Sequence, residues 1–384
     1  MKKLCMITTI SLTQKSFVVD NAKNLHKKCG YDITLICNDD KEFESSLPDY
    51  IHFIPVKMAR GIDLSAISSM ANLIKVFKRE RFDMVQYSTP NASCYASIAA
   101  KVSKVPIRLY CQWGIRYVGL NGFPRKVFKA IEKVVCSNST DIRSASRLNK
   151  AFAVSEGLYE EGKAKVVGNG GTIGVDTKVY DISKKEEWNR IIRERYNLGS
   201  DEFVFGFAGR ISADKGCNEL ITAFKSILED DGINAKLMIV GPVEDNCGID
   251  RHLMQWIKNS KNVILTGMID STEMCQYYSA MNVLVHPTYR EGFGMVIQEA
   301  GALAVPVITT EIPGAGEVME NGISSVHVAP RSASELKKAM VDLRTDLKKT
   351  ESLGKNAYLR TKQYYERSIM LENLRLDYVE LVGE

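Results

Sequence analysis

The amino-acid sequence predicts an α/β protein built from two consecutive, doubly wound parallel sheets. Short apolar, β-rich segments alternate with helical patterns along the whole chain. This alternation restarts near residue 202, after a linking region around residues 170–200 that is first glycine-rich and then charged. A chain of 384 residues also exceeds what one hydrophobic core usually supports, so two domains are expected.

The strand candidates fall into two groups of six. Those of the first half lie at residues 4–10, 32–37, 51–56, 83–88, 107–112 and 150–155. Those of the second half lie at residues 202–210, 235–241, 262–267, 282–288, 305–310 and 325–329. Strands this apolar are expected to be buried on both faces. Helical patterns separate them, for example at residues 66–80, where apolar residues recur three and four positions apart.

These patterns place the domain boundary between residues 178 and 179. The first domain is expected to span residues 1–178 and the second residues 179–366. A last helical stretch, at residues 367–384, is expected to pack back on the first domain.

Composition is typical of a soluble globular protein, with 45% hydrophobic and 25% charged residues. No apolar run approaches the roughly 20 residues that span a bilayer, and the opening "MKKLCMITTI" is interpreted as a first strand and not a signal peptide. The nine cysteines are scattered without a C-x-x-C pair, and the five histidines lack metal-ligand spacing. We therefore expect a cytoplasmic protein without disulfides or a structural metal.

Charge is distributed unevenly between the two halves. Residues 1–180 contain 27 Lys and Arg against 16 Asp and Glu, whereas the remaining 204 residues contain 24 against 30. This asymmetry is either ordinary variation or a sign that the first half faces an anionic partner, such as phospholipid headgroups, a phosphorylated acceptor or nucleic acid. Nucleic acid is the weakest of these, because the basic residues lack interleaved aromatics.

Residues 122–136 predict a short basic amphipathic helix. Four cations lie among its apolar residues, namely Arg125, Lys126, Lys129 and Lys133. Such a helix either packs its apolar side inward on the domain surface or makes a peripheral contact with the anionic inner face of the cell membrane.

Two segments at predicted strand ends carry the chemistry, since ligands of open parallel sheets bind beyond the carboxyl ends of the strands. In "GFAGRISADKG", Gly209 and Arg210 end a strand, Lys215 follows, and Gly216 opens a helix. Two cations beside helix N-terminal N–H groups can hold a diphosphate. The alternative is a plain strand–turn–helix with solvated charges. Neither G-x-x-x-x-G-K-[ST] nor G-x-G-x-x-G occurs, so a nicotinamide cofactor has little support.

The second segment, "REGFGMVIQEA", holds two glutamates in an apolar, glycine-containing stretch. Glu291 precedes Gly292 and Gly294 in a loop, and Glu299 follows about two helical turns later. Carboxylates accept hydrogen bonds from sugar or ribose hydroxyls, which are donors. Alternatively, neither glutamate binds a ligand: Glu291 is stabilised by the dipole at the helix N-terminus, and Glu299 is exposed to solvent. The apolar surroundings of Glu299 make a solvated face hard to find.

These motifs together resemble one family. G-R-x-x-x-x-K-G, E-G-F-G-x-x-x-x-E-A, A-x-x-x-P-V-I and G-x-x-E occur in this order and are similar to those of the retaining GT-B glycosyltransferases of family four, the group one glycosyltransferases. The likeness is nearest to bacterial enzymes that build capsular, exopolysaccharide or lipid-linked glycans. It covers residues 150–330 by motif and the first domain by architecture only.

The resemblance implies two Rossmann-like domains that face a cleft, the first on the acceptor side and the second binding the donor. It implies transfer of a sugar, with retention, from a nucleoside diphosphate donor, for which we expect UDP, to a glycan or lipid-linked glycan. Arg210 and Lys215 would hold the diphosphate and stabilise the leaving group, Glu291 would contact the sugar, and Glu299 the ribose. No cofactor or metal is expected. Further donor-binding positions are Gly209, Gly292, Phe293 and Gly294.

The chain departs from the family pattern in the first domain. The loop at residues 8–17 has no glycine where many members have a glycine-rich loop. Many members also carry a His-Gly pair where this chain has Trp113 and Gly114, and tryptophan cannot act as a general base. The candidates for the acceptor side of the cleft are Gln112, Trp113, Arg116 and Tyr117.

Two other functions share the architecture. A nucleotide-sugar 2-epimerase would lack the E-G-F-G-x-x-x-x-E-A arrangement and would need no acceptor. A non-catalytic binding subunit of the same fold is disfavoured because Arg210, Lys215, Glu291 and Glu299 are all present.

Overall fold

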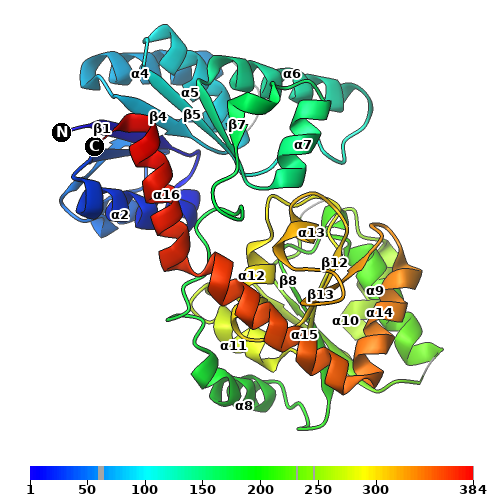
Figure 1. Cartoon of the computed structure of the whole chain (residues 1–384). Helices are drawn as coiled ribbons and strands as arrows, with labels where there is room; N and C mark the ends of the chain where they lie inside the picture. Colours follow the sequence, from blue (N-terminus) through cyan, green and yellow to red (C-terminus); the bar gives the residue numbers. More distant parts are fainter. Residues whose placement is uncertain (59–64, 231, 245–246, 384) are drawn as a thin grey trace. The chain divides into compact units, whose positions relative to one another are not determined.

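The computed structural model describes residues 1–58, 65–230, 232–244 and 247–383, and it divides into two compact units (Figure 1). The first unit comprises Met1–Ile173 together with the chain from Ser368 onward, and the second comprises Gly174–Arg367. Each contains one parallel sheet with helices on both of its faces, so the prediction of two doubly wound α/β sheets is confirmed. A cleft between the two units would depend on their relative placement, so it stays a prediction.

The first sheet has seven parallel strands in the order β3-β2-β1-β4-β5-β6-β7. Their bounds are β1 (Lys3–Ile7), β2 (Asp32–Cys37), β3 (Ile51–Pro55), β4 (Met84–Tyr87), β5 (Ile107–Gln112), β6 (Asp141–Ser144) and β7 (Ala164–Lys165). The helices of this unit are α1 (Ser11–Phe17), α2 (Val19–Cys29), α3 (Lys41–Ser46), α4 (Ser65–Glu80), α5 (Pro90–Val102), α6 (Gly122–Asn138), α7 (Arg147–Ser155), the short turn η1 (Glu161–Lys163) and α16 (Arg367–Val382).

One strand prediction of the first half is wrong. Residues 150–155 lie in α7, whose N-terminus is capped by the Ser146 side chain accepting a hydrogen bond from the Asn149 N–H at 3.0 Å. A short apolar run does not distinguish a strand from a helix, and here the cap favours the helix. The sheet is instead completed by β6 and β7, which the sequence analysis did not identify.

Alternation along β1 explains why its residues are apolar on both faces. Leu4 and Met6 pack with α2, α3 and α16, whereas Cys5 and Ile7 pack with α4 and α5 on the opposite face. Figure 1 shows α2 and α16 on one side of this sheet and α4 and α5 on the other. The terminal helix α16 is thus part of the core of the first unit.

A buried ion pair attaches α16 to the first sheet. The Arg143 Nε on β6 lies 2.7 Å from Oδ2 and 2.9 Å from Oδ1 of Asp377, and the two side chains are 11% and 4% exposed. Lys165 on β7 adds contacts to Asp377 at 3.8 Å and to Glu380 at 2.6 Å. Tyr378 also donates its hydroxyl to Gln86 on β4.

The second sheet has six parallel strands in the order β10-β9-β8-β11-β12-β13. Their bounds are β8 (Phe203–Ala208), β9 (Ala235–Val240), β10 (Val263–Gly267), β11 (Val283–His286), β12 (Val307–Thr310) and β13 (Ser325–Val328). The helices are α8 (Lys185–Arg195), α9 (Cys217–Glu229), α10 (Arg251–Asn259), α11 (Met274–Ala280), α12 (Met295–Ala302), α13 (Ala315–Val318), α14 (Ala333–Thr345) and α15 (Leu347–Arg360). The short turns are η2 (Ile182–Lys184), η3 (Ala213–Lys215) and the π-helical η4 (Thr361–Tyr365).

The strand order of the second sheet reverses at β8. From β8 the chain adds β9 and β10 on one side and then β11, β12 and β13 on the other. At such a switch point the loops after the two central strands turn to opposite sides of the sheet. The carboxyl ends of β8 and β11 are therefore where a ligand site is expected.

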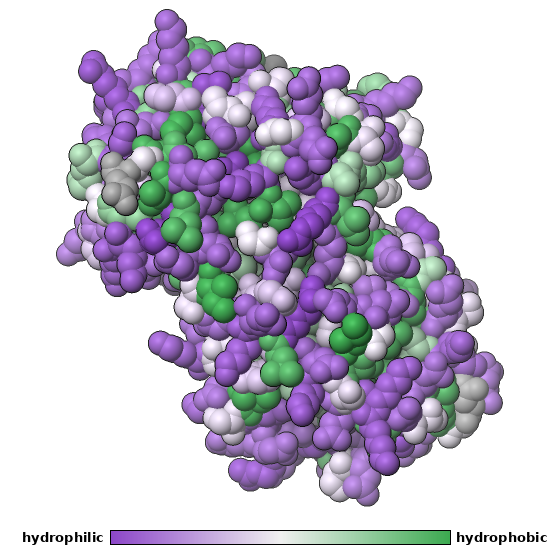
Figure 2. All heavy atoms as spheres, in the orientation of Figure 1, coloured by the Kyte–Doolittle hydropathy of each residue, from purple (hydrophilic) through white to green (hydrophobic). Residues whose placement is uncertain are grey.

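Within the described ranges, no helix combines the length and apolarity that crossing a bilayer requires. Figure 2 shows one face of the molecule as mostly hydrophilic, with separate apolar patches. Among the described residues, large apolar side chains exposed to solvent occur in both units, and those more than 60% exposed are Met1, Leu12, Ile67, Phe123 and Met268.

Replacing Asp377 with alanine should destabilise the first unit by about 3–5 kcal/mol, because it leaves the Arg143 guanidinium buried without its carboxylate. Urea unfolding measures the effect. Glu380→Ala is the matched control, since it removes a carboxylate of the same helix that is 66% exposed and should cost far less. Equal losses for the two variants would contradict the role of the buried pair.

Candidate active site

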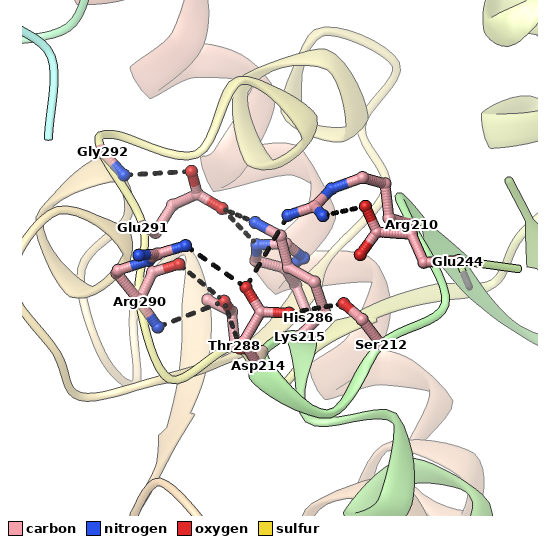
Figure 3. A network of polar contacts seen from close by, with 10 residues as sticks. All are labelled: Arg210, Ser212, Asp214, Lys215, Glu244, His286, Thr288, Arg290, Glu291 and Gly292. Atoms are coloured by element: carbon pink, nitrogen blue, oxygen red, sulfur yellow. Dashed lines mark hydrogen bonds and ion pairs between the residues drawn. The ribbon is translucent and has the colours of Figure 1, made fainter. Parts of the chain in front are cut away.

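A polar network lies beyond the carboxyl ends of β8 and β11 (Figure 3). Arg210 follows β8 after one residue, Lys215 ends the turn η3, and Glu291 lies in the loop after β11. Because β8 and β11 are parallel neighbours, their carboxyl ends share one edge of the sheet. The structure thus brings together three of the residues that the sequence predicts for one site.

Lys215 and Glu291 form the centre of this network. The Lys215 Nζ lies 2.8 Å from Glu291 Oε2, and the two side chains are 17% and 19% exposed. The same oxygen lies 3.1 Å from Nε2 of His286, the last residue of β11. The other carboxylate oxygen, Oε1, accepts the backbone N–H of Gly292 at 3.0 Å. Glu291 is therefore held from three directions, as Figure 3 shows.

These contacts determine the charge state of Glu291. Burial alone would raise the pKa of its carboxyl group, but the Lys215 ammonium and the hydrogen bond from His286 hold that pKa well below its usual range. Burial lowers the pKa of His286, and the nearby Glu291 opposes this only in part. At neutral pH the network therefore contains an ionised Glu291 beside a neutral His286.

A second group of charges adjoins the first. Arg210 forms an ion pair with Glu244, which follows β9, and its guanidinium lies 3.7 Å from Asp214. Arg290 reaches the same carboxylate of Asp214 at 3.5 Å. The Ser212 hydroxyl donates to Asp214 at 2.5 Å. Burial would raise the pKa of Asp214, but this hydrogen bond and the two arginines lower it.

Gly216 allows the two loops to approach each other. It caps α9 with φ 72°, and a Cβ atom there would lie 1.9 Å from the carbonyl oxygen of Pro287 in the β11 loop. The Tyr289 N–H donates to the Asp214 carbonyl at 2.9 Å and joins the loops directly. This close backbone approach places Lys215 within reach of Glu291.

The start of α12 offers backbone groups and not a side chain. Gly294 caps this helix with φ 69°. Phe293 is 3% exposed, and its ring packs edge-on against Tyr365 with 5.5 Å between ring centroids. The side chain of Phe293 thus belongs to the core, and only its main chain is available to a ligand. Gly209, also predicted at this site, follows β8 with φ 143°.

Glu299 lies in a separate polar cluster on α12. Its Oε2 accepts the hydroxyl of Tyr278 at 2.8 Å, and the Tyr180 hydroxyl also bonds to it. Burial raises the pKa of Glu299, and the two tyrosine hydroxyls offset this in part. The motif predicts a carboxylate open to ribose hydroxyls, whereas the structure shows one that already accepts hydrogen bonds from two tyrosines.

The four first-unit candidates lie at or after the end of β5 and differ in exposure. Gln112 is fully buried and joins a network with Glu132 of α6 at 2.7 Å and Tyr159 at 2.9 Å. Tyr117 is fully buried as well. In this they differ from the expectation of side chains that contact an acceptor.

The other two first-unit candidates are accessible. Trp113 is half-buried, and its ring lies 5.4 Å from that of Phe17, which ends α1. Arg116 is exposed, with its guanidinium 4.5 Å from the centre of the Phe128 ring. Among the first-unit candidates, these two are the ones that a ligand can reach.

Sequence reasoning missed several members of the network. His286 falls inside the strand predicted at residues 282–288 and was given no role, although it lies only five residues before Glu291. Asp214 and Arg290 lie inside the two quoted motifs and were given no role. Glu244 follows a different strand, so only the pairing of β8 with β9 brings it close to Arg210.

The arrangement combines cations that can bind an anion with a carboxylate that can accept hydroxyl groups. Arg210, Lys215 and Arg290 supply the positive charge, and an ammonium group has two N–H donors left after one bond to a carboxylate. Among the described residues, no group of three or more His, Cys, Asp or Glu side chains is placed to hold a metal ion.

Gly216→Ala should lower the free energy of unfolding by at least about 2 kcal/mol. The alanine would have to keep a left-handed backbone conformation, and its methyl group would clash with the Pro287 carbonyl oxygen. Gly232→Ala is the matched control, since Gly232 has φ 61° and no heavy atom within 4 Å of a built Cβ. The control should cost about 1 kcal/mol. Thermal unfolding of both variants checks this, and equal shifts would contradict the close approach.

Comparison with known proteins shows the family of this chain. A family model described as "Glycosyl transferases group 1" matches residues 189–360, and one described as "Glycosyl transferase 4-like" matches residues 6–146. The capsular polysaccharide biosynthesis glycosyltransferase CapM of Staphylococcus aureus is 32% identical over 93% of this chain and 92% of its own length.

Two further relatives cover nearly the whole chain. The Escherichia coli UDP-Gal:alpha-D-GlcNAc-diphosphoundecaprenol alpha-1,3-galactosyltransferase is 23% identical over 92% of this chain and 90% of its own. The structure of Anabaena HepE in complex with UDP superposes with a TM-score of 0.79, covering 99% of this chain and 100% of that one at 19% identity. The chain therefore belongs to the group 1 glycosyltransferases and has their two-domain GT-B fold.

Proposed function

We propose that this protein transfers a hexosyl group, with retention of anomeric configuration, from a UDP-sugar to a glycan or polyprenyl-diphosphate-linked glycan in bacterial surface polysaccharide synthesis. The observation that carries the proposal is the Lys215–Glu291 pair, which sets a cation for a diphosphate beside a carboxylate for a sugar hydroxyl. The capsular and diphosphoundecaprenol relatives support the class of product, and the UDP complex of HepE supports the nucleotide.

In this proposal Arg210 and Lys215 bind the donor diphosphate. Backbone N–H groups at Phe293 and Gly294, where α12 begins, add donors for its oxygens. The Gly292 N–H, expected in the same role, already donates to Glu291 Oε1. Negative charge grows on the nucleoside diphosphate as the sugar departs, and fixed cations stabilise that charge more in the transition state than in the ground state. These cations take the place of a metal ion, so the reaction is proposed to need neither metal nor cofactor.

Glu291 contacts the donor sugar. Its ionised carboxylate can only accept hydrogen bonds, so a sugar hydroxyl donates to it. A negative charge near the anomeric carbon also favours the positive charge of an oxocarbenium-like transition state. Retention follows if the acceptor hydroxyl attacks the face from which the diphosphate leaves, where the departing phosphate oxygen is the nearest group to take its proton.

Glu299 binds the ribose hydroxyls of the nucleotide in the same proposal. A carboxylate offers about four lone-pair sites, and the hydroxyls of Tyr278 and Tyr180 occupy two of them. On the acceptor side, Trp113 presents an aromatic face on which a sugar ring can stack, and Phe17 fixes its orientation. Arg116 adds a cation near the same strand end.

The proposed donor site predicts that Lys215→Ala and Glu291→Ala each lower turnover about 100-fold or more, as expected when a stabilising group is removed from a transition state. Release of UDP from a UDP-sugar in the presence of acceptor measures this. Lys236→Ala is a matched control, because Lys236 pairs with Glu202 at 3.3 Å and is also 17% exposed. It should keep its turnover.

A panel of UDP-, GDP- and ADP-sugars tests the donor in the same preparations. Binding to the folded state raises the unfolding temperature, so the UDP-sugars should give the largest shift in the wild type and a smaller one in Lys215→Ala. Unchanged turnover in both site variants, or conversion of the UDP-sugar to an epimer without acceptor, would overturn the proposal.

We further propose that the protein acts in the cytoplasm and contacts the anionic inner face of the membrane through α6. The structure divides the four cations of this helix into two pairs. Arg125 and Lys129 point to Glu156, at 2.9 Å and 2.8 Å, and are partly buried. Lys126 and Lys133 are exposed, and Phe123 at the start of the helix is 78% exposed. An exposed aromatic residue with exposed lysines suits a lipid headgroup region.

Charge reversal at Lys126 and Lys133 should therefore weaken cosedimentation with vesicles that contain phosphatidylglycerol, and added salt should weaken binding of the wild type. The matched control is reversal at Lys348 and Lys355, which are exposed and also seven residues apart, on α15. Binding that is absent, independent of salt, or equally reduced by the control pair would contradict the membrane contact.

A further inference from the structure

His286 is a partner of Glu291 that the proposed function does not use. It ends β11, its side chain is 2% exposed, and its Nε2 lies 3.1 Å from Glu291 Oε2. Lys215 reaches the same oxygen at 2.8 Å. The two donors differ in rigidity, because the imidazole is anchored on a strand whereas the lysine has a long flexible side chain.

The surroundings of His286 fix which nitrogen carries its proton. An ionised carboxylate is only an acceptor, so Nε2 must be the N–H that donates to Glu291. The other nitrogen, Nδ1, is buried and has no hydrogen-bond partner among the described residues. A second proton would place an unpaired N–H in the interior, which is costly. The ring therefore stays neutral, in agreement with the lowered pKa of His286.

Packing fixes the ring plane as well. The Phe207 ring of β8 lies 6.4 Å away and is nearly parallel to it, at 26°. The His286 carbonyl accepts the Thr309 hydroxyl at 3.2 Å, which joins the end of β11 to β12. Two neighbouring strands thus set the position from which Nε2 donates.

On the basis of the proposed function, we infer that His286 is a positioning residue that orients Glu291 toward the donor sugar. Its N–H holds Oε2 against the strand end while the Gly292 N–H holds Oε1. Lys215 alone would allow the carboxylate to follow the moving ammonium group. With both oxygens anchored, Glu291 keeps one orientation, and Lys215 keeps donors for the diphosphate.

Three substitutions at one position test this inference. His286→Gln keeps an N–H donor at about the reach of Nε2, His286→Asn keeps an amide that is too short to reach Glu291, and His286→Leu removes the donor. Loss of a hydrogen bond to a charged group predicts that kcat falls about 10- to 100-fold for the Asn and Leu variants. The Gln variant should stay within about threefold of the wild type.

Binding of UDP alone separates positioning from misfolding. UDP affinity, measured by titration calorimetry, should stay within about twofold for all three variants, because His286 contacts the sugar-binding carboxylate and not the diphosphate cations. In a Glu291→Gln background, His286→Leu should cause little further loss of kcat, since residues that act through one another are not additive.

Two outcomes overturn the inference and leave the proposed function intact. One is full activity of His286→Leu alongside an inactive Glu291→Ala. The other is a loss from His286→Leu that is equally large with and without Glu291. Full turnover by Glu291→Ala would instead overturn the proposed donor site, and with it the positioning role of His286.

Discussion

The parallel pairing of β8 with β11, at the point where the strand order reverses, is the constraint on which the donor site depends. It places the ends of two strands side by side although more than seventy residues separate Arg210 from Glu291 in the sequence. The absence of a side chain at Gly216 lets the two loops touch, and the backbone bond from Tyr289 to Asp214 joins them. The charged side chains are therefore carried on one rigid edge.

Charge in this edge is nearly balanced. Arg210 and Arg290 face Asp214 and Glu244, and Lys215 faces Glu291. Such pairs offset the cost of partial burial for each charge and keep the cations in place without a ligand. In the proposed function, the donor diphosphate replaces the carboxylates that pair with Arg210. The Lys215–Glu291 pair remains, with Lys215 at the diphosphate and Glu291 at the sugar.

In the first unit the end of β5 carries a buried hydrogen-bond network. Gln112 joins the buried carboxylate of Glu132 and the hydroxyls of Tyr110 and Tyr159 in one hydrogen-bonded network. Burial raises the pKa of Glu132, and the hydrogen bonds from Gln112 and Tyr110 offset this in part. This network fixes the inner face of α6, and it leaves the exposed lysines of that helix on the outside.

The sequence by itself determined the α/β class, eleven of the thirteen strands and the motif residues at the strand ends. These features can be predicted from the sequence because apolar periodicity and glycine placement are local properties of the chain. It mistook residues 150–155 for a strand, since a helix cap decides so short a run. Only the tertiary structure decided that Gln112 is buried, that Glu299 is shared by Tyr278 and Tyr180, and that His286 contacts Glu291. Burial and hydrogen-bond partners depend on which strands pair, and pairing joins residues that are distant in the sequence.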